Sequence, residues 1–310
     1  MVMQTLAPIF LVGCPRSGTT LLQQMLDAHP EVAIAPETHF IRNFWLKREQ
    51  YGSLESDRAY QLLLQAIVDL PEFAEMELSA PDFIAAAQTL ERSYKNLFGL
   101  VLSQFRQKRA VARVGEKTPN HLLYMQTLQE FFPEARFIHI IRDPRAVVNS
   151  WKKVPWTTGS IGGDAGVWRR YMATARQCPP ADGAIYNLHY EALVSNPEAS
   201  LKAICQFLGL SFQAAMLDYY RQDSKGVNVS REPWKGNAVK PVSADSLTRW
   251  QQDMTPEEIA TVDWVVKDEM MRLGYEPYAS GWQVLWVATQ LKTERSFNRA
   301  RQYVEKRIKR

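Results

Sequence analysis

The chain has 310 residues, of which 46% are apolar and 23% charged, and a formal net charge of +4. This composition is ordinary for a globular protein, and the mild charge fits a local site for an anionic ligand better than a nucleic-acid surface. Three widely spaced cysteines predict neither a disulfide framework nor a metal site. No stretch approaches 18 apolar residues and the first residues lack a targeting pattern, so we expect no spanning helix and a cytoplasmic location.

The first predicted element is a buried strand, Ile9 to Val12, followed by a turn rich in Gly, Pro and Ser and by a helix from about Thr19. Such a turn is an anion cradle, because backbone N–H groups and the helix dipole face it. Arg16 adds a guanidinium suited to bidentate phosphate binding. Gly13 and Gly18 have phosphate-loop spacing, but Thr19 stands where that loop has its lysine. We therefore expect an anion other than a nucleoside triphosphate with magnesium.

After this loop, further short strands alternate with helices. Strands are expected at Val32–Ala35, Val111–Glu116, Arg136–Ile141 and Ile185–His189. Helices are expected over most of 40–108 and at Pro119–Phe132. One further helix is expected to begin at Pro144, and another to end at about Gln177. The last helices are expected at Pro197–Leu208, Phe212–Arg221, Ser243–Gln252 and Pro256–Leu273. Glycines predict a mobile loop at Gly159, Gly162, Gly163 and Gly166, and residues 222–242 read as polar and irregular. The alternation predicts an α/β fold with a mostly parallel sheet covered on both faces.

Polar residues follow three of these strands. They are Arg16 to Thr20, Glu37, and Arg142 to Ser150. Because the crossovers between parallel strands are right-handed, we expect the three turns to meet at one edge of the sheet, where open α/β sheets place their ligands.

Two of the turns resemble the donor motifs of sulfotransferases that use 3′-phosphoadenosine 5′-phosphosulfate (PAPS). The run GCPRSGTTL from Gly13 is similar to their 5′-phosphosulfate loop, and RDPRAVVNS from Arg142 is similar to their 3′-phosphate motif. Weaker matches reach about residue 275 and resemble the tyrosylprotein sulfotransferase-like branch, with its bacterial members. They are Leu26–Pro30, Glu37–Thr38, Glu116–Pro119, His189–Glu191 and Lys240–Val242.

The resemblance implies a P-loop-like parallel sheet flanked by helices, with residues 1–280 as the sulfotransferase domain and a helical cap at about 40–110. It implies PAPS as donor, its desulfated form PAP as product, and no metal. The implied catalytic residues are Arg16, Glu37 as general base and Lys117 near the leaving oxygen. The implied donor-binding residues are Arg16, Ser17, Gly18, Thr19, Thr20, Arg142, Ser150, Tyr190, Ser230 and Lys240. The implied acceptor-side residues are His39, Lys117 and Ser230.

Two positions depart from the tyrosylprotein pattern. Val154 stands where that branch has an arginine, and the nearby Lys152 and Lys153 are shifted from that position. His39 also stands where those enzymes have an arginine near the acceptor. The acceptor therefore stays open among a peptide tyrosine, a sugar, a lipid and a small phenol.

Each assignment has a structural alternative. Glu37 can offset a helix dipole, Lys117 can be a surface lysine, Arg142 can pair with surface acids, Ser150 can bond a helix carbonyl, and Tyr190 can be a core aromatic. His39 can be the base in place of Glu37. At the level of the protein, the alternatives are a P-loop kinase or NTPase and a non-catalytic nucleotide-binding module.

The last segment, 281–310, lies beyond the resemblance and predicts a basic amphipathic helix. Trp282, Leu285, Trp286 and Thr289 share a helical face, and basic residues crowd the end of the segment: Arg295, Arg299, Arg301, Lys306, Arg307, Lys309 and Arg310. One interpretation is a helix that packs on its own domain. The other is an interfacial helix at an anionic membrane or a dimer partner.

Overall fold

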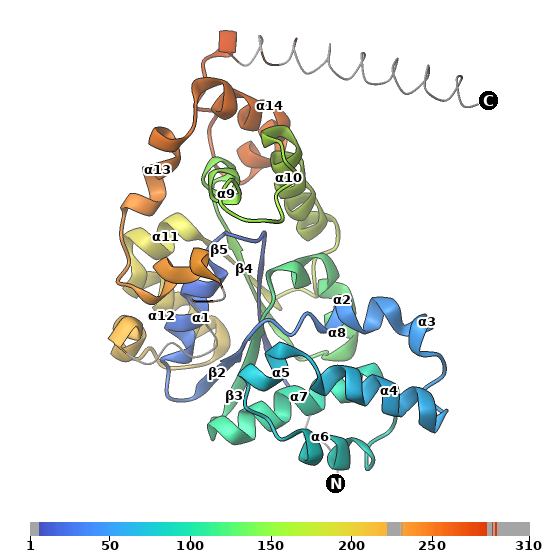
Figure 1. Cartoon of the computed structure of the whole chain (residues 1–310). Helices are drawn as coiled ribbons and strands as arrows, with labels where there is room; N and C mark the ends of the chain where they lie inside the picture. Colours follow the sequence, from blue (N-terminus) through green and yellow to red (C-terminus); the bar gives the residue numbers. More distant parts are fainter. Residues whose placement is uncertain (1–5, 222–229, 231, 284–286, 288, 290–310) are drawn as a thin grey trace, which may run out of the picture. The chain divides into compact units, whose positions relative to one another are not determined.

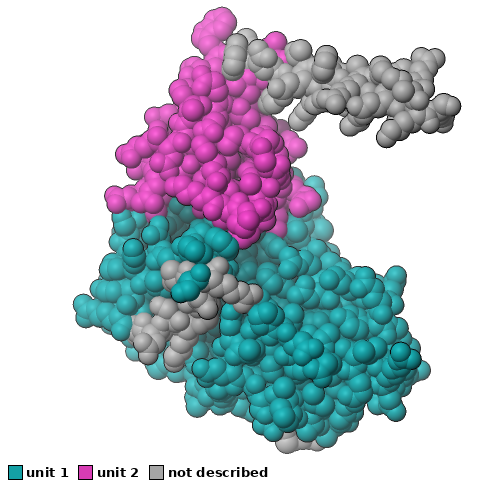
Figure 2. All heavy atoms as spheres, in the orientation of Figure 1, with its two compact units in different colours: residues 1–142, 174–244 teal, residues 143–173, 245–310 magenta. Residues whose placement is uncertain are grey.

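The structure is a computed structural model, and it describes residues 6–221, 230, 232–283, 287 and 289. Contacts divide the chain into two compact units, residues 1–142 with 174–244 and residues 143–173 with 245–310 (Figure 2). The predicted domain boundary at residue 280 stays a prediction.

The first unit is built on a five-stranded parallel sheet. Its strands are β1 Ile9–Gly13, β2 Val32–Ala35, β3 Arg113–Lys117, β4 Arg136–Ile141 and β5 Ile185–His189. Their order is β2-β3-β1-β4-β5. All four neighbouring pairs are parallel. The chain leaves β1 toward β2 and β3 on one side, then continues to β4 and β5 on the other. The carboxyl ends of β1 and β4 thus mark the point where the strand order reverses, which is the usual ligand position in open α/β sheets.

Helices cover both faces of this sheet, as the alternating pattern predicts. Figure 1 shows α1 (Thr19–Asp27), α11 (Tyr190–Ser195) and α12 (Pro197–Leu208) on one side. On the other side lie α2 (Phe40–Asn43), α7 (Tyr94–Arg109) and α8 (Met125–Phe131). The α/β fold expected from the sequence, a parallel sheet covered by helices on both faces, is confirmed.

The predicted helical cap consists of the helices between β2 and β3. Besides α2 and α7 they are η1 (Trp45–Lys47), α3 (Arg48–Tyr51), α4 (Asp57–Val68), α5 (Pro71–Glu75) and α6 (Ala80–Ala87). Three of them begin where a serine accepts a hydrogen bond from a first-turn N–H, namely Ser56, Ser79 and Ser93.

Stacked aromatic rings connect this cap to the sheet. Phe10 in β1 lies 5.5 Å from Phe137 in β4 and 6.1 Å from Phe98 in α7, measured between ring centroids. Phe98 in turn stacks on Phe40 at 4.4 Å. Phe40 begins α2 only three residues after Glu37, so the core fixes the segment that carries the predicted base.

The second unit contains α9 (Pro144–Trp151), most of α10 (Ile161–Gln177), α13 (Asp245–Asp253) and α14 (Pro256–Arg272). Within it, Arg145 is buried, donates to the Asp143 carboxylate at 2.8 Å and lies 4.5 Å from the centroid of the Trp250 ring. The ion pair of Arg145 with Asp143 therefore lies inside this unit.

The predicted mobile loop of glycines is wrong, because Gly162, Gly163 and Gly166 lie inside α10. Asp164 stabilises the beginning of this helix by accepting hydrogen bonds from the Thr157 hydroxyl and from the Thr158 hydroxyl and N–H. A Cβ at position 163 would lie 2.3 Å from the Thr158 hydroxyl. Gly163 is thus needed for close packing of this turn.

Three other expectations need correction. The helix expected at Pro119–Phe132 is a 3₁₀ segment, η2 (Pro119–Tyr124), followed by α8. The helix expected at Phe212–Arg221 is two short 3₁₀ turns, η3 (Ala214–Met216) and η4 (Tyr219–Arg221). Within 222–242, residues 233–239 form a 3₁₀ segment, η5 (Pro233–Val239), which packs against α1. Most of the predicted C-terminal helix lies outside the described residues.

Candidate active site

The loop between β1 and α1 has the geometry of an anion cradle. Gly18 is the N-cap of α1 with φ 102°, and no described side chain caps the helix. Arg16 also has a positive φ, 75°, a conformation that costs free energy in a non-glycine residue and is often found at functional sites. The Ser17 hydroxyl is fully buried without a hydrogen bond from the described residues. An uncapped first turn and an unpaired buried hydroxyl are consistent with a phosphate-like ligand at this loop.

Arg16 supplies the positive charge of the loop. It is half-buried, and its Nη2 donates to the carbonyl oxygen of Trp234 at 2.7 Å. Burial, aided by the nearby Arg142, lowers the pKa of Arg16 to about 10. Its guanidinium therefore stays charged at neutral pH. Thr19 is buried and Thr20 half-buried in the first turn of α1, where the sequence predicts donor contacts.

Tyr190 and Arg142 lie against the same loop. The Arg142 guanidinium lies 4.1 Å from the centroid of the Tyr190 ring, and its Nη1 donates to the Arg16 carbonyl oxygen at 3.1 Å. The ring also lies so close to Gly18 that a Cβ there would approach it within 2.4 Å. The structure thus brings together four predicted donor-binding residues at the carboxyl ends of β1 and β4 and the start of α11.

Glu37 and Lys117 form an ion pair beside this loop. Lys117 ends β3, is 1% exposed, and donates from Nζ to Glu37 Oε1 at 2.5 Å. The alternative of a surface lysine is therefore wrong. Burial alone would raise the pKa of Glu37, but the charges of Lys117 and Lys235 outweigh it and hold this pKa well below its usual range. Glu37 is therefore an ionised carboxylate, consistent with the predicted base.

His39 lies next to Glu37, as the sequence predicts for a residue of the acceptor side. Its Nε2 is 3.6 Å from Glu37 Oε2, and its backbone has φ 49°. Burial lowers the pKa of His39 despite the neighbouring carboxylate. The imidazole is therefore neutral at neutral pH.

Glu37 also contacts a second lysine, Lys235, which the sequence did not indicate. Lys235 in η5 is 8% exposed, and its Nζ lies 3.1 Å from Glu37 Oε1 and 2.5 Å from Glu232 Oε2. Lys235 lies in a polar stretch without periodicity, 198 residues after Glu37. No local pattern could have connected the two residues.

A buried carboxylate behind the site was also missed. Glu116 is 0% exposed and accepts hydrogen bonds from the N–H and hydroxyl of Thr38, both at 3.0 Å, and from the Thr118 hydroxyl. Its other oxygen lies 3.0 Å from Nδ1 of His121. Glu116 thus holds together the two segments that carry Glu37 and Lys117. A charged residue inside an otherwise apolar strand was the signal that the sequence offered.

For the remaining predicted residues, the structure gives the local surroundings. Ser150 lies on α9, in the second unit, and Val154 is buried there. The two lysines before Val154 are paired within that unit: Lys152 with Glu258 at 2.9 Å and Lys153 with Asp253 at 3.4 Å. Ser230 is an exposed turn residue, and Lys240 follows η5 with its carbonyl accepting from the Tyr219 hydroxyl. The predicted roles of Ser150, Ser230 and Lys240 stay predictions.

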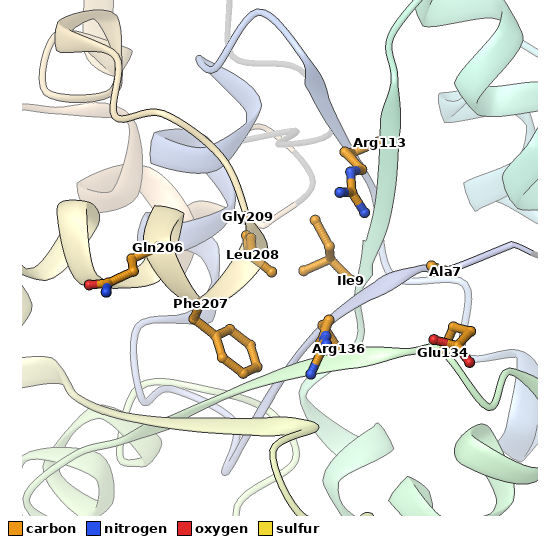
Figure 3. A pocket seen from close by; sticks show the side chains of 9 residues that line it. All are labelled: Ala7, Ile9, Arg113, Glu134, Arg136, Gln206, Phe207, Leu208 and Gly209. Carbon is orange, nitrogen blue, oxygen red and sulfur yellow. The ribbon is translucent and has the colours of Figure 1, made fainter.

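A pocket at the opposite edge of the sheet contains none of these residues. Its lining includes Ile9, Arg113 and Arg136, which begin or lie at the start of β1, β3 and β4 (Figure 3). Among the described residues, no group of three potential ligands could hold a metal ion, and no helix is long and apolar enough to cross a bilayer.

Comparisons with known proteins agree on one family. The sequence pattern described as "Sulfotransferase family" matches residues 8–214. Protein-tyrosine sulfotransferase 1 of Danio rerio is 30% identical over 281 residues, covering 88% of this chain and 73% of that protein. Protein-tyrosine sulfotransferase A of Caenorhabditis elegans is 29% identical over 280 residues, covering 88% and 68%. The sulfotransferase domain of the Synechococcus PCC 7002 olefin synthase, 21% identical, has a similar fold, with a TM-score of 0.63 over 89% of this chain and 98% of that domain.

Proposed function

Because the chain belongs to the sulfotransferase family and takes PAPS as its donor, we propose that the cradle beside Glu37 and Lys117 is where the sulfuryl group passes to an acceptor hydroxyl. The observation that carries the proposal is the buried Lys117–Glu37 pair next to an uncapped loop that holds Arg16. Anion binding alone would require the loop but not a carboxylate. A carboxylate held beside an anion cradle can accept a proton, which is what an acceptor hydroxyl must lose.

The residues of the cradle fit the donor. PAPS supplies the sulfuryl group and leaves a nucleotide phosphate. Arg16 and the N–H groups of the α1 first turn neutralise and orient negative charge there. Arg142 and Tyr190 present a cation and an aromatic face beside the loop, which suit a phosphate and a purine nucleoside. In-line transfer of such a group depends mainly on positioning and charge stabilisation, which these side chains supply.

Glu37 and Lys117 have separate roles in the proposed reaction: Glu37 accepts the proton, and Lys117 stabilises the leaving group. Glu37 is ionised and 20% exposed, so it can accept a hydrogen bond from the acceptor hydroxyl and take its proton. Lys117 has three N–H donors, and only one of them is used on Glu37. The others can stabilise charge that develops on the leaving oxygen.

The first prediction tests the base. Glu37→Gln keeps the size of the side chain but cannot accept a proton, so we expect turnover to fall about 10²-fold or more. PAP affinity is expected to stay near the wild-type value. Steady-state kinetics and a PAP titration measure the two quantities separately.

Glu31→Gln is the matched control, since Glu31 is an exposed carboxylate that comes just before β2. It is expected to keep both turnover and PAP affinity. Near-normal turnover of Glu37→Gln would remove Glu37 from the role of base and favour His39.

The acceptor carries a hydroxyl, and we propose a tyrosine of a peptide as its first candidate. The support is that relatives across 88% of the chain are named protein-tyrosine sulfotransferases. His39, where that branch has an arginine, favours an acceptor with less negative charge around the tyrosine. Mass spectrometry of products from a panel of tyrosine peptides, sugars, lipids and small phenols tests this. Sulfation confined to the other three classes would contradict it.

The basic tail gives a second proposal, which concerns location. We propose that 281–310 holds a cytoplasmic enzyme at an anionic membrane, because its tryptophans and its run of basic side chains combine two attractive contributions. The full chain is then expected to sediment with anionic vesicles at physiological salt, and a chain ending at Ser280 is expected to stay in solution with the same activity on a soluble acceptor. A full chain that never sediments would contradict membrane binding, and a mass twice that of the monomer would favour a homodimer.

A further inference from the structure

Lys235 is a buried cation that has no role in the reaction proposed above. Only 8% of its side chain is exposed, and two carboxylates, Glu37 and Glu232, lie within 3.1 Å of its Nζ. Taking an ammonium out of water is costly unless it is paired and hydrogen-bonded. The two acids are therefore the physical reason why Lys235 occupies this position.

The segment that carries Lys235 is also held from the other side. The carbonyl oxygen of Trp234, the preceding residue, accepts a hydrogen bond from Arg16 at 2.7 Å. η5 packs against α1, the helix that follows the anion loop. Lys235 is thus fixed to the same loop that surrounds the predicted donor site.

The contacts of Glu37 are unequal on its two oxygens. Lys117 and Lys235 both donate to Oε1, at 2.5 and 3.1 Å. Oε2 accepts no hydrogen bond from the described residues, and its neighbour His39 is 3.6 Å away. One oxygen is therefore anchored, and the other is available to a ligand.

We propose, building on the function proposed above, that Lys235 is a positioning residue for the base. Together with Lys117 it anchors Oε1 of Glu37, so that Oε2 faces the acceptor hydroxyl, and Glu232 shares the charge of Lys235 so that Glu37 can still accept a proton.

The charges around Glu37 set the direction of the expected effects. The charged and titratable groups that face it are Lys117 at the end of β3, Lys235 on η5, His39 beside it and Arg16 after β1. Burial would raise the pKa of Glu37, but the two lysines outweigh burial and hold this pKa below its usual range. Removing Lys235 must therefore raise the pKa of Glu37. Neutralising Glu232 must lower it, because Lys235 is then left with Glu37 alone.

The first measurement is the pH dependence of acceptor turnover. For Lys235→Gln we expect the acidic limb to move up by roughly 1–2 pH units. We also expect kcat on the plateau to fall on the order of 10-fold, because Oε2 is less well oriented. Glu232→Gln is expected to move the limb in the opposite direction or leave it below the range measured. Lys235→Arg, which keeps the cation, is expected to restore the wild-type limb.

Lys202→Gln is the matched control, since Lys202 is an exposed lysine with its own carboxylate, Glu198, at 2.6 Å. A limb for Lys235→Gln that coincides with wild type over the accessible pH range would overturn the proposal. If Glu37→Gln is inactive in the same assays, only the role of Lys235 fails. If Glu37→Gln is active, the proposed base itself fails.

A second measurement needs neither donor nor turnover. Burial by itself would lower the pKa of Lys235, but Glu37 and Glu232 outweigh it and raise this pKa. Trace acetylation of the full chain at pH 8, read by peptide mass spectrometry, is therefore expected to be slow at Lys235. The rate at Lys235 is expected to rise in Glu37→Gln and in Glu232→Gln, while the rate at Lys202 stays constant. Unchanged acetylation of Lys235 in both variants would show that the pairing is absent in solution and overturn the proposal.

Discussion

Arg142 makes two contacts beside the anion loop, and its contribution to nucleotide binding can be measured separately from catalysis. It lies over the Tyr190 ring and donates to the carbonyl of Arg16, at the end of β4. The resemblance to the 3′-phosphate motif assigns this guanidinium to the phosphate that distinguishes PAP from adenosine 5′-phosphosulfate. Its position beside the anion loop supports that assignment.

Arg142→Ala is therefore expected to weaken PAP more than adenosine 5′-phosphosulfate. A charge-assisted hydrogen bond contributes about 1.5–3 kcal/mol, so the additional loss is roughly 10- to 100-fold in affinity. Calorimetric titration of both nucleotides measures it. Arg136→Ala, at the other end of the same strand, is the control and is expected to change neither affinity. Equal losses for the two nucleotides in Arg142→Ala would show that the 3′-phosphate is bound elsewhere.

Single residues show where sequence reasoning succeeds and where it stops. Arg16 and Glu37 could be placed at one edge of the sheet because each follows an apolar strand, and strand ends of a parallel sheet converge. Lys117 was indicated only by the resemblance to the sulfotransferase family. Lys235 and Glu116 could not be assigned in this way. Lys235 reaches the site through a long-range contact, and the role of Glu116 is apparent only from the side chains around it.

At the scale of elements, apolar runs predicted the strands well. Three of the five strands, β2, β4 and β5, have the predicted bounds, and β1 and β3 differ by at most two residues at either end. The glycines of α10 predicted a loop but lie in a helix, because hydrogen bonds from the Thr157–Thr158 turn to Asp164 offset the poor helix propensity of glycine. The Phe212–Arg221 segment has helical composition but forms only single 3₁₀ turns.

The turn between β1 and α1 depends on a glycine in two ways. Gly18 has φ 102°, and a Cβ there would lie 2.4 Å from the Tyr190 ring. Gly18→Ala is therefore expected to displace Tyr190 from Arg142 and to weaken PAP binding. The backbone strain alone is expected to cost about 1–2 kcal/mol in the free energy of unfolding.

Gly209→Ala is the control that separates the effect of backbone strain from the effect of a steric clash with Tyr190. Gly209 caps α12 with φ 68°, and a Cβ there would meet nothing within 4 Å. It is expected to lower the unfolding midpoint while leaving PAP affinity intact. Chemical denaturation and PAP titration of both variants provide the comparison. Equal PAP affinities in the two variants would contradict a role for the Gly18–Tyr190 contact in donor binding.

For the whole molecule, the parallel α/β architecture and the family followed from the sequence, and both are confirmed. The reason is physical: apolar strands, glycine turns and helix starts are local signals that recur in a fixed order. No local sequence pattern identifies the acceptor. It depends on the shape and charge around Oε2 of Glu37, to which distant segments such as η5 contribute.

We propose that the β1–α1 loop binds an adenosine bisphosphate and not a nucleoside triphosphate with magnesium. Thr19 replaces the lysine that a triphosphate needs, and Arg142 with Tyr190 supplies a place for a nucleotide with an additional phosphate. A kinase or NTPase is therefore expected to prefer ATP with magnesium, whereas an adenosine bisphosphate site is expected to prefer PAP.

Thermal unfolding of the full chain with PAP and, separately, with ATP and magnesium tests this claim most directly. At about 100 times its dissociation constant, a ligand that binds only the folded state stabilises it by roughly 2.7 kcal/mol. We predict a clear rise of the unfolding midpoint with PAP and little change with ATP and magnesium. A rise with ATP and magnesium and none with PAP would contradict a bisphosphate site at this loop.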